Sequence, residues 1–395
     1  MDWSFLIRNK ESIHVTTDSR KVTPGCVFVA LKGEHFDGND FVEQARRDGA
    51  EYIISGENAL AELQDLARAW RRELGLPILG ITGTNGKTTT KELCAAVLST
   101  KYKLYYTQGN LNNQLGVPLT LLNITRAHEM AIVEMGASHP GDIKELVEIA
   151  EPNYGLITNV GKAHLQGFGS FEGVMRTKAE LYDFLRAHNG FCFRNTDNPY
   201  LAQMAGDLKT VEYHTGTMLS DTHLVGGYNA ENVSAAICVG RYFGVSEEDA
   251  LAAIRAYIPS NNRSQLMQTE KNTVVVDAYN ANPTSMQAAI NAFDNLQMLQ
   301  SSNLQMPQAY ILGAMRELGE YSHLEHQNIV NMLLERKAEK VLLVGEEYKE
   351  TTAPYPVFEN VEALCEYLQR EPLSGYTILL KGSRSNQLEK VIPLL

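Results

Sequence analysis

The sequence predicts an α/β protein of three domains. Short apolar runs alternate with segments of helical spacing along most of the 395 residues, as in parallel sheets that are covered by helices. A glycine-rich stretch at 80–90 joins one apolar run to a helix. A chain of this length usually divides into several domains, and we expect them at 1–76, 77–258 and 259–395.

Composition limits the classes of function. The formal net charge of −12 disfavours broad binding of nucleic acid. Five scattered cysteines without a Cys-x-x-Cys pair are typical of reduced thiols in a cytosolic protein. The first residues lack the pattern of a signal peptide, and no apolar stretch is long enough to span a bilayer. We therefore expect a soluble, cytoplasmic protein without membrane insertion.

The first domain combines short strands and helices with two polar clusters. Its elements are expected at 27–31, 41–49, 52–55 and 60–74. The polar clusters lie at 17–20 and 32–38. From the residues alone, both clusters are interpreted as surface turns.

The central domain carries the clearest alternation of strands and helices. Its strands are expected at 76–81, 103–107, 130–134, 154–159 and 190–193. Ligands of open parallel sheets bind at the carboxyl ends of the strands. Four polar stretches lie at or just after these ends, so we expect the binding site along this edge.

The stretch at 80–90, here called the phosphate loop, predicts a site for a nucleoside triphosphate. Its glycines let backbone N–H groups surround an anion, and the helix N-terminus adds positive potential. Lys87 can reach the outer phosphates, and the Thr88 hydroxyl can ligate Mg²⁺. Ile81 stands where the usual pattern has its first glycine, so the loop is a shortened variant. A helix-capping turn with a chance lysine is the alternative.

Three further residues of the central domain stand out by position. Glu134 closes an apolar strand, where a carboxylate is costly to bury without a cation. It is therefore either a Mg²⁺ ligand or a member of a strand-end ion pair. From the residues alone, His164 is a lone core or surface histidine, and Lys178 is an ordinary helix lysine.

The third domain begins in the polar, turn-rich stretch 259–265. One of its strands ends in Asp277. Another is followed by the basic glycine turn 381–384, which favours an anion. His323 and His326 form a His-x-x-His pair, which we interpret as a solvated helix start and not as a metal site.

The segment Gly-Thr-Asn-Gly-Lys-Thr-Thr-Thr-Lys at 83–91, which contains most of the phosphate loop, resembles the ATP loop of the Mur ligases. The resemblance covers essentially the whole chain, in three units. It implies a central P-loop ATPase domain, flanked by a small α/β amino-terminal domain and a Rossmann-like carboxyl-terminal domain. Members of this family activate a carboxylate as an acyl phosphate and then form an amide.

Three stretches resemble the branch of the family that adds a dipeptide in peptidoglycan precursor synthesis. They lie at 107–118, at 277–283 and at 312–319. The chain departs from the family pattern in three places, where Tyr228 replaces a His, Asn262 replaces a Gly and Ala314 replaces a common Asp.

The resemblance implies ATP and two Mg²⁺ ions as cofactors, with a carbamylated lysine at Lys178. The implied nucleotide contacts are Gly83, Thr84, Asn85, Gly86, Lys87, Thr88, Thr89, Asn232, Asp277, Tyr279, Asn280 and Asn282. The implied metal ligands are Thr88, Glu134 and His164, and the implied catalytic residues are Lys87, Lys178, His164 and Arg263. A histidine is an unusual ligand for Mg²⁺, which prefers oxygen. Asn229 is explained equally well as a helix cap.

The resemblance also implies two small-molecule substrates, UDP-MurNAc-tripeptide and D-Ala-D-Ala, for a protein that we expect to be a monomer. The implied substrate contacts are Ser19, Arg20, Gly33, Asn110, Asn113, Lys381, Ser383 and Arg384. The third residue of the tripeptide, meso-diaminopimelate or lysine, is left open.

Two alternatives stay open. One is another ligase of the family, either the ligase that adds the third residue or a folylpolyglutamate synthase. The Asp-Ser-Arg stretch at 18–20, before the phosphate loop, argues against the folate enzyme. The other is a nucleotide-binding protein that has lost its chemistry. Lys87, Glu134, His164 and Lys178 are all present, which argues against that loss.

Overall fold

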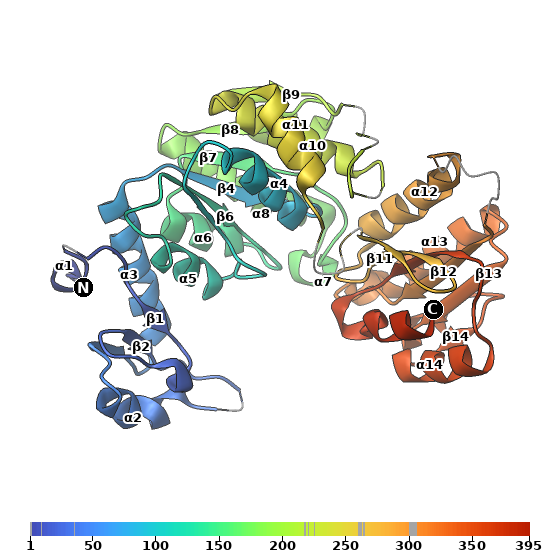
Figure 1. Ribbon diagram of the computed structural model, residues 1–395, viewed down its shortest axis with the longest axis horizontal. Coiled ribbons are helices and arrows are strands. Elements are labelled where there is room, and N and C mark those ends of the chain that lie inside the picture. The colour runs from blue at the N-terminus through green and yellow to red at the C-terminus, as the bar shows by residue number, and fades with distance from the viewer. Residues whose placement is uncertain are drawn as a thin grey trace.

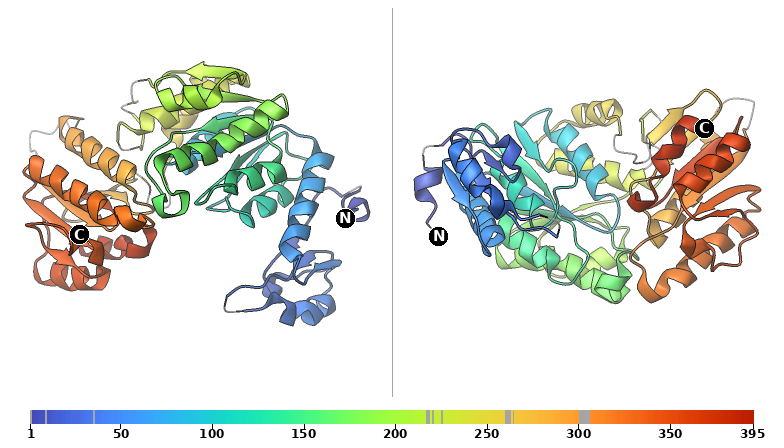
Figure 2. Two further views of the ribbon diagram at one scale, coloured as in Figure 1. Left: turned by 180° about the vertical axis from the view of Figure 1, so that it is seen from behind. Right: turned by 90° about the horizontal axis from the view of Figure 1, so that it is seen from below.

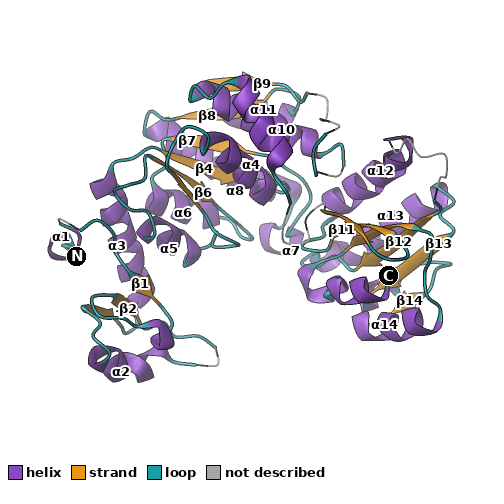
Figure 3. Cartoon of the chain, in the orientation of Figure 1, coloured by secondary structure: helices purple, strands orange, loops and turns teal. Residues whose placement is uncertain are grey.

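The chain forms three sheets that lie side by side, with the first and third at opposite ends of the molecule (Figures 1 and 2). The computed structural model describes residues 2–8, 10–34, 36–216, 219, 221–224, 226–259, 263, 265–299 and 306–395, with the backbone alone at 295–299. Helices and strands alternate in each part (Figure 3). The predicted α/β class with three domains is confirmed, while the exact boundaries stay a prediction.

The amino-terminal sheet has three parallel strands in the order β1-β2-β3. Its elements are α1 (Ser4–Ile7), β1 (Val15–Thr16), η1 (Ser19–Lys21), β2 (Val27–Val29), η2 (Gly38–Phe41), α2 (Val42–Arg47) and β3 (Tyr52–Ile54). The strand β1 was not predicted, because two residues carry no alternation pattern. These strands are too short to build a large core of their own.

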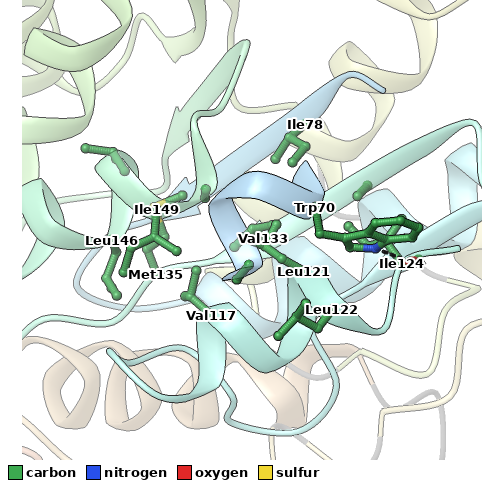
Figure 4. Close-up of a cluster of buried hydrophobic side chains, with 14 of the residues drawn as sticks. Trp70, Ile78, Val117, Leu121, Leu122, Ile124, Val133, Met135, Leu146 and Ile149 are labelled. Carbon is green, nitrogen blue, oxygen red and sulfur yellow. Dashed lines mark hydrogen bonds between the residues drawn. The ribbon is translucent and has the colours of Figure 1, made fainter. Parts of the chain in front are cut away.

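Helix α3 (Ala59–Leu74) connects this sheet to the central domain (Figure 1). Its side chains Leu66 and Trp70 are fully buried, in one cluster with Leu121 of α5 (Gly116–Leu122). The indole Nε1 of Trp70 donates a hydrogen bond of 2.8 Å to the carbonyl of Ile124 (Figure 4). The predicted boundary assigns α3 to the first domain, yet its apolar face packs on the second.

The central sheet has six parallel strands in the order β5-β6-β4-β7-β8-β9. Its strands are β4 (Ile78–Thr82), β5 (Leu104–Tyr106), β6 (Met130–Glu134), β7 (Tyr154–Ile157), β8 (Phe191–Asn195) and β9 (Thr210–Tyr213). With α5, its helices are α4 (Lys87–Leu98), α6 (Asp142–Ala150), α7 (Leu165–Phe168), α8 (Phe171–Ala187), α9 (Pro199–Ala205), α10 (Asn229–Tyr242) and α11 (Glu247–Ala256). The five predicted strands are present with small shifts at their ends, and β9 was missed.

Helices cover both faces of the central sheet. Alternate side chains of a strand point to opposite faces, so Ile78 joins the cluster that includes α3, α5, α6 and α8, whereas Leu79 joins that of α4, α10 and α11. The chain runs to one side of β4 after that strand and to the other side after β6. Such a reversal opens a crevice at the carboxyl end of the central strand.

The carboxyl-terminal sheet has the strand order β10-β11-β15-β12-β13-β14, with β10 antiparallel to β11 and the other pairs parallel. Its strands are β10 (Gln265–Gln268), β11 (Thr273–Asp277), β12 (Gln308–Gly313), β13 (Lys340–Val344), β14 (Val357–Phe358) and β15 (Thr377–Lys381). Its helices are α12 (Pro283–Leu299), η3 (Gly319–Tyr321), α13 (Ser322–Glu335), η4 (Glu346–Tyr348), α14 (Val361–Arg370), η5 (Arg384–Asn386) and η6 (Leu388–Leu394).

Apolar clusters fill both faces of this sheet as well. Within the described residues, every helix is too short or too polar to span a bilayer.

Candidate active site

A cleft of about 840 Å³ opens between the central and the carboxyl-terminal domains. One wall is formed by residues that follow β4, β6 and β7, and the other by residues at the ends of β11 and β15. The predicted residues that line it are Thr84, Asn85, Gly86, Lys87, Thr88, Thr89, Asn113, Glu134, His164, Asn232, Arg263, Asp277, Tyr279, Asn280 and Lys381. The structure thus brings most of the predicted nucleotide, metal and catalytic residues to one place.

The phosphate loop needs its glycines for two reasons. Gly83 and Gly86 both have positive φ angles, of 145° and 77°, which side chains rarely allow. A Cβ atom at Gly83 would lie 1.9 Å from Thr158 Oγ1, and one at Gly86 would lie 2.5 Å from Asn232 Oδ1. Helix α4 begins immediately after Gly86, so its positive N-terminal end faces the cleft.

The residues after β7 hold the phosphate loop in place. Asn159 accepts a hydrogen bond of 3.0 Å from the N–H of Asn85 through its side chain, and one of 2.9 Å from the N–H of Thr84 through its carbonyl. The hydroxyl of Thr158 donates to the carbonyl of Asn85 at 2.6 Å. The loop conformation is therefore set by the neighbouring strand before any ligand binds.

Lys87 folds back over its own loop. Its Nζ donates to the carbonyls of Gly83 and Thr84 at 2.8 Å and 3.0 Å. Burial lowers the pKa of Lys87 from 10.5 to about 8, with the charge of Glu134 opposing the shift and that of Arg263 adding to it. A bound polyphosphate would favour the charged form, because a nearby anion stabilises an ammonium.

Glu134 is almost fully buried at the end of β6. Its Oε1 accepts hydrogen bonds from the Thr88 hydroxyl at 3.2 Å and from the Asn112 amide at 2.9 Å. Its Oε2 has no hydrogen-bond partner, although the Nζ of Lys91 lies 3.6 Å away. Asn112 and Lys91 were both missed by the sequence analysis.

The arrangement of Thr88 and Glu134 fits Mg²⁺. Both supply oxygen atoms, which this ion prefers, and one buried carboxylate oxygen lacks a partner. In the described part of the chain, no group of three or more His, Cys, Asp or Glu side chains could hold a metal. Phosphate oxygens and water would have to complete the coordination, as is common for Mg²⁺.

His164 links the two walls. Its backbone is left-handed with φ of 49°, and its Nδ1 contacts a carboxylate oxygen of Glu317 from the carboxyl-terminal domain. Burial lowers the pKa of His164, and the charge of Glu317 opposes that shift. Burial therefore favours the neutral imidazole, which is the form that binds metals.

Lys178 of α8 does not line the cleft. Its side chain is almost fully buried, and its Nζ lies 5.5 Å from the centre of the Phe168 ring. Burial, and secondarily the charge of Lys87, hold the pKa of Lys178 well below its usual value. This shift favours the uncharged amine at Lys178.

The opposite wall is built around an ion pair. The Nζ of Lys381 lies 2.6 Å from the Asp277 carboxylate and donates to the carbonyl of Asn280 at 3.1 Å. Asp277 and Lys381 are register partners on the adjacent parallel strands β11 and β15. The guanidinium of Arg263 stacks 3.7 Å from the centre of the Tyr279 ring. We predicted Asp277 for the nucleotide and Lys381 for the dipeptide, so their direct pairing was not foreseen.

Two predicted nucleotide residues, Gly83 and Asn282, lie beside the cleft without lining it. The absence of a side chain at Gly83 leaves space for Thr158. The amides of Asn282 and Asn85 hydrogen-bond across the two domains, at 2.8 Å in one direction. Two further contacts cross between the walls, from the Nζ of Lys162 to Glu325 at 2.7 Å and from the N–H of Lys162 to Thr284 Oγ1 at 3.0 Å.

Several predicted substrate contacts lie away from the cleft. Ser19 and Arg20 lie in η1 and Gly33 lies in the loop after β2, in the amino-terminal domain at the other end of the molecule (Figure 1). The exposed Arg20 pairs with its neighbour Asp18 at 2.8 Å. Asn110 is an exposed loop residue outside the cleft lining.

Two more predicted contacts at the carboxyl-terminal domain also stand outside the cleft lining. Ser383 is buried, and its hydroxyl donates to the carbonyl of Ala314 at 2.9 Å, so it connects two loops. Arg384 is exposed, with Glu389 3.8 Å away. The turn-rich stretch around Arg263, predicted at 259–265, lies in part outside the described residues, at 260–262 and 264.

The interpretation of the His-x-x-His pair as a solvated helix start is wrong for one of the two residues. His323 is exposed, but His326 is fully buried. Its Nε2 accepts from the N–H of Met315 at 3.0 Å, and its Nδ1 donates to the carbonyl of Ser322 at 2.7 Å. His326 therefore holds the loop that carries Glu317.

Three family models match the chain. They are described as "Mur ligase family, catalytic domain" at 13–95, "Mur ligase middle domain" at 81–215, and "Mur ligase, glutamate ligase domain" at 262–384. Their order along the chain is the order of the three sheets.

Individual proteins match over nearly the whole chain. A UDP-N-acetylmuramoyl-tripeptide–D-alanyl-D-alanine ligase of Bacillus subtilis is 33% identical, over 96% of this chain and 92% of the relative. The structure of MurF from Acinetobacter baumannii is 28% identical and matches with a TM-score of 0.83, over 96% and 92% of the two chains. The structure of MurF ligase from Thermotoga maritima in complex with ADP is 27% identical, with a TM-score of 0.84 over 98% of both chains.

Proposed function

This chain belongs to the Mur ligase family, and we propose that it joins D-Ala-D-Ala to UDP-MurNAc-tripeptide in an ATP-dependent, ADP-forming reaction of peptidoglycan precursor synthesis. One observation carries this proposal. The phosphate loop, which resembles that of the Mur ligases, and the 277–283 stretch, which resembles the dipeptide-adding branch, face each other across one cleft. The full-length similarity to ligases of that name supports the choice of substrates.

In the first step, a terminal carboxylate oxygen of the tripeptide attacks the γ-phosphorus of ATP. A P–O bond forms to the carboxylate while the P–O bond to ADP breaks, which gives an acyl phosphate and ADP. Lys87 and the start of α4 lie where they can neutralise the triphosphate. Arg263 approaches from the opposite wall.

In the second step, the amine nitrogen of D-Ala-D-Ala attacks the acyl carbon. The C–N bond forms, the C–O bond to phosphate breaks, and the amine loses a proton as phosphate leaves. No protein nucleophile is required, so the two walls act by orienting the reactants and by stabilising charge.

We propose Thr88, Glu134 and His164 as the residues that hold Mg²⁺. When bound, the ion supplies positive charge that neutralises the phosphates during transfer. For Lys178 we propose carbamylation, in which the neutral amine adds to CO₂ and releases a proton. The low pKa of Lys178 supports this role, because only the uncharged amine is nucleophilic.

The two ends of the nucleotide sugar substrate are proposed to contact different domains. Ser19, Arg20 and Gly33 would hold the uridine diphosphate at the amino-terminal sheet, while the peptide carboxylate reaches the cleft. Asn113 and Lys381 line the cleft and are the best placed residues for the peptide side. We further propose that the protein works in the cytoplasm, where ATP is available, and as a monomer, because one chain supplies both walls.

The test is phosphate release from ATP by the purified chain. UDP-MurNAc-tripeptide, with either meso-diaminopimelate or lysine, and D-Ala-D-Ala are offered separately and then together, with products identified by mass. Release only with both substrates, plus a pentapeptide product, is the expected result. Release with a different acceptor would move the protein elsewhere in the family. No release with any acceptor would favour an inert nucleotide-binding protein.

A further inference from the structure

Lys91 is a buried lysine without a hydrogen bond. It lies on α4, close to one helical turn after Thr88, and its side chain is almost completely inaccessible. Among the described residues, its Nζ has no hydrogen-bond partner. Lys87 on the same helix differs, because its Nζ donates to two carbonyls. A buried ammonium is costly unless nearby charges compensate it.

Two carboxylates supply that compensation. Glu134 Oε2 lies 3.6 Å from the Nζ of Lys91, and Glu92 Oε1 lies 3.8 Å from it. Both distances exceed that of a good hydrogen bond, so Lys91 is held by charge and not by directed bonds. Glu134 Oε2 also lacks a hydrogen-bond partner. Lys91 and Glu134 are therefore not joined by a hydrogen bond that would have to break before they separate.

A second cavity gives the ammonium space to move. It has a volume of about 330 Å³ and is lined by Lys91, Glu92, Tyr106 and Tyr257, among others. The hydroxyl of Tyr257 hydrogen-bonds to Glu92 and fixes that carboxylate at the cavity wall. The side chain of Lys91 can thus turn from Glu134 towards Glu92 without leaving the protein interior.

We infer that Lys91 is an internal counter-ion, which neutralises Glu134 in the nucleotide-free protein. When a divalent cation arrives with the nucleotide, Lys91 moves away from this carboxylate and the cation binds there. This inference rests on the metal site given under the proposed function. With Lys91 in place, a divalent cation has to displace an ammonium from Glu134, so the cation binds weakly by itself. Phosphate oxygens add ligands and negative charge, and they shift the balance towards the metal.

The decisive variant is Lys91→Met, which keeps the length of the side chain and removes its charge. Binding of Mn²⁺, used as the probe, is measured by calorimetry with and without ADP. Without ADP, Lys91→Met should bind Mn²⁺ about tenfold or more tightly than the unaltered protein, because no ammonium competes for Glu134. The gain should disappear in the double variant Lys91→Met/Glu134→Gln. Lys91→Arg keeps the charge and should show no gain.

Thermal unfolding provides a second readout that does not depend on activity. Lys91→Met leaves the Glu134 carboxylate without its counter-ion, so its midpoint should lie below that of the unaltered protein and rise when Mn²⁺ is added. If Lys91→Met fails to fold, Lys91→Gln takes its place in both measurements. Unchanged Mn²⁺ affinity in the folded variant would overturn the inference.

The two proposals fail in different ways. If the unaltered protein binds Mn²⁺ with ADP and Lys91→Met behaves like it without ADP, only the role of Lys91 is wrong. If the unaltered protein binds no Mn²⁺ even with ADP, the proposed metal site is wrong, and the inference falls with it.

Discussion

The two walls of the cleft are built on different principles. On the central wall, candidate residues contact one another through side chains, as Thr88 contacts Glu134, and the phosphate loop is clamped by the end of β7. On the carboxyl-terminal wall, strand register brings Asp277 and Lys381 together, and one aromatic ring supports Arg263. Each wall is therefore held in its conformation mainly by residues of its own domain.

Few polar contacts join the two walls, compared with those that hold each wall together. The polar contacts named above are the pair of Asn85 and Asn282, that of His164 and Glu317, and the two contacts of Lys162. The chemistry of each wall is thus fixed locally, whereas the distance between the walls depends on a few polar contacts. Closure of domains around a ligand commonly uses joints of this kind. Changes within a wall should therefore have larger effects than changes between walls.

The largest effect is expected at the central wall, from Lys87→Ala. Loss of this cation should lower turnover about 10³-fold or more, because a positioned donor acts mainly on transition-state charge. Phosphate release in the full assay measures it. Folding should be retained, since Lys87 bonds only to its own loop. The matched control is the exposed Lys349→Ala, and retained turnover in Lys87→Ala would contradict the assignment of the loop.

A smaller effect is expected at the opposite wall, on stability. Lys381→Met removes the partner of Asp277 and should cost about 3 kcal/mol in the free energy of unfolding, since it leaves a largely buried carboxylate unpaired. The double variant Lys381→Met/Asp277→Asn should recover part of this loss. Urea unfolding measures both. Equal losses in the single and the double variant would mean that the ion pair does not organise this wall.

The two walls also differ in how much of them the sequence could predict. The phosphate loop and the strands of the central sheet follow from local patterns, since glycines, the helix start and apolar runs are read within a few residues. The pairing of Asp277 with Lys381 requires β11 and β15 to be neighbours, although they are far apart in the chain. Strand order of this kind is absent from local pattern. The strands β1, β10 and β14 were missed for another reason, because runs of two to four residues carry too little pattern.

Individual side chains were harder to predict than elements. The run Asn110 to Asn113 contains three asparagines, and only the turn geometry decides that Asn112 contacts Glu134. Asn113 instead accepts from the N–H of Gly116 at the start of α5. Lys91 left a usable signal, because its position after Thr88 places both on one face of the helix.

A moderate effect is expected between the walls, from Lys162→Met and Glu325→Gln. Glu325 is buried, but Lys162 is half exposed, so solvent weakens the pair and a double-mutant cycle should give a coupling energy of about 1 kcal/mol. Neither residue lines the cleft. Nucleotide affinity should therefore stay unchanged while kcat/KM falls a few-fold. A coupling energy near zero would mean that this contact does not set the distance between the walls.

The smallest effect concerns pH and the loop that supports Glu317. Burial lowers the pKa of His326 below 6.5. Its Nε2 can accept from the N–H of Met315 only while the ring is neutral. As pH falls below 6.5, the unfolded chain takes up a proton that the folded chain does not, so stability is lost. The loss attributable to His326 should therefore grow as the pH falls from 6.5 to 5.5.

Urea unfolding at the two pH values should therefore show a smaller acid loss for His326→Gln than for the unaltered protein. A Gln side chain offers both a donor and an acceptor but does not titrate. His323→Gln, on the same helix but exposed, is the matched control and should behave like the unaltered protein. If His326→Gln loses as much stability in acid as the unaltered protein, the loop is held by other contacts, and the carboxyl-terminal wall is less dependent on a single buried side chain than its geometry implies.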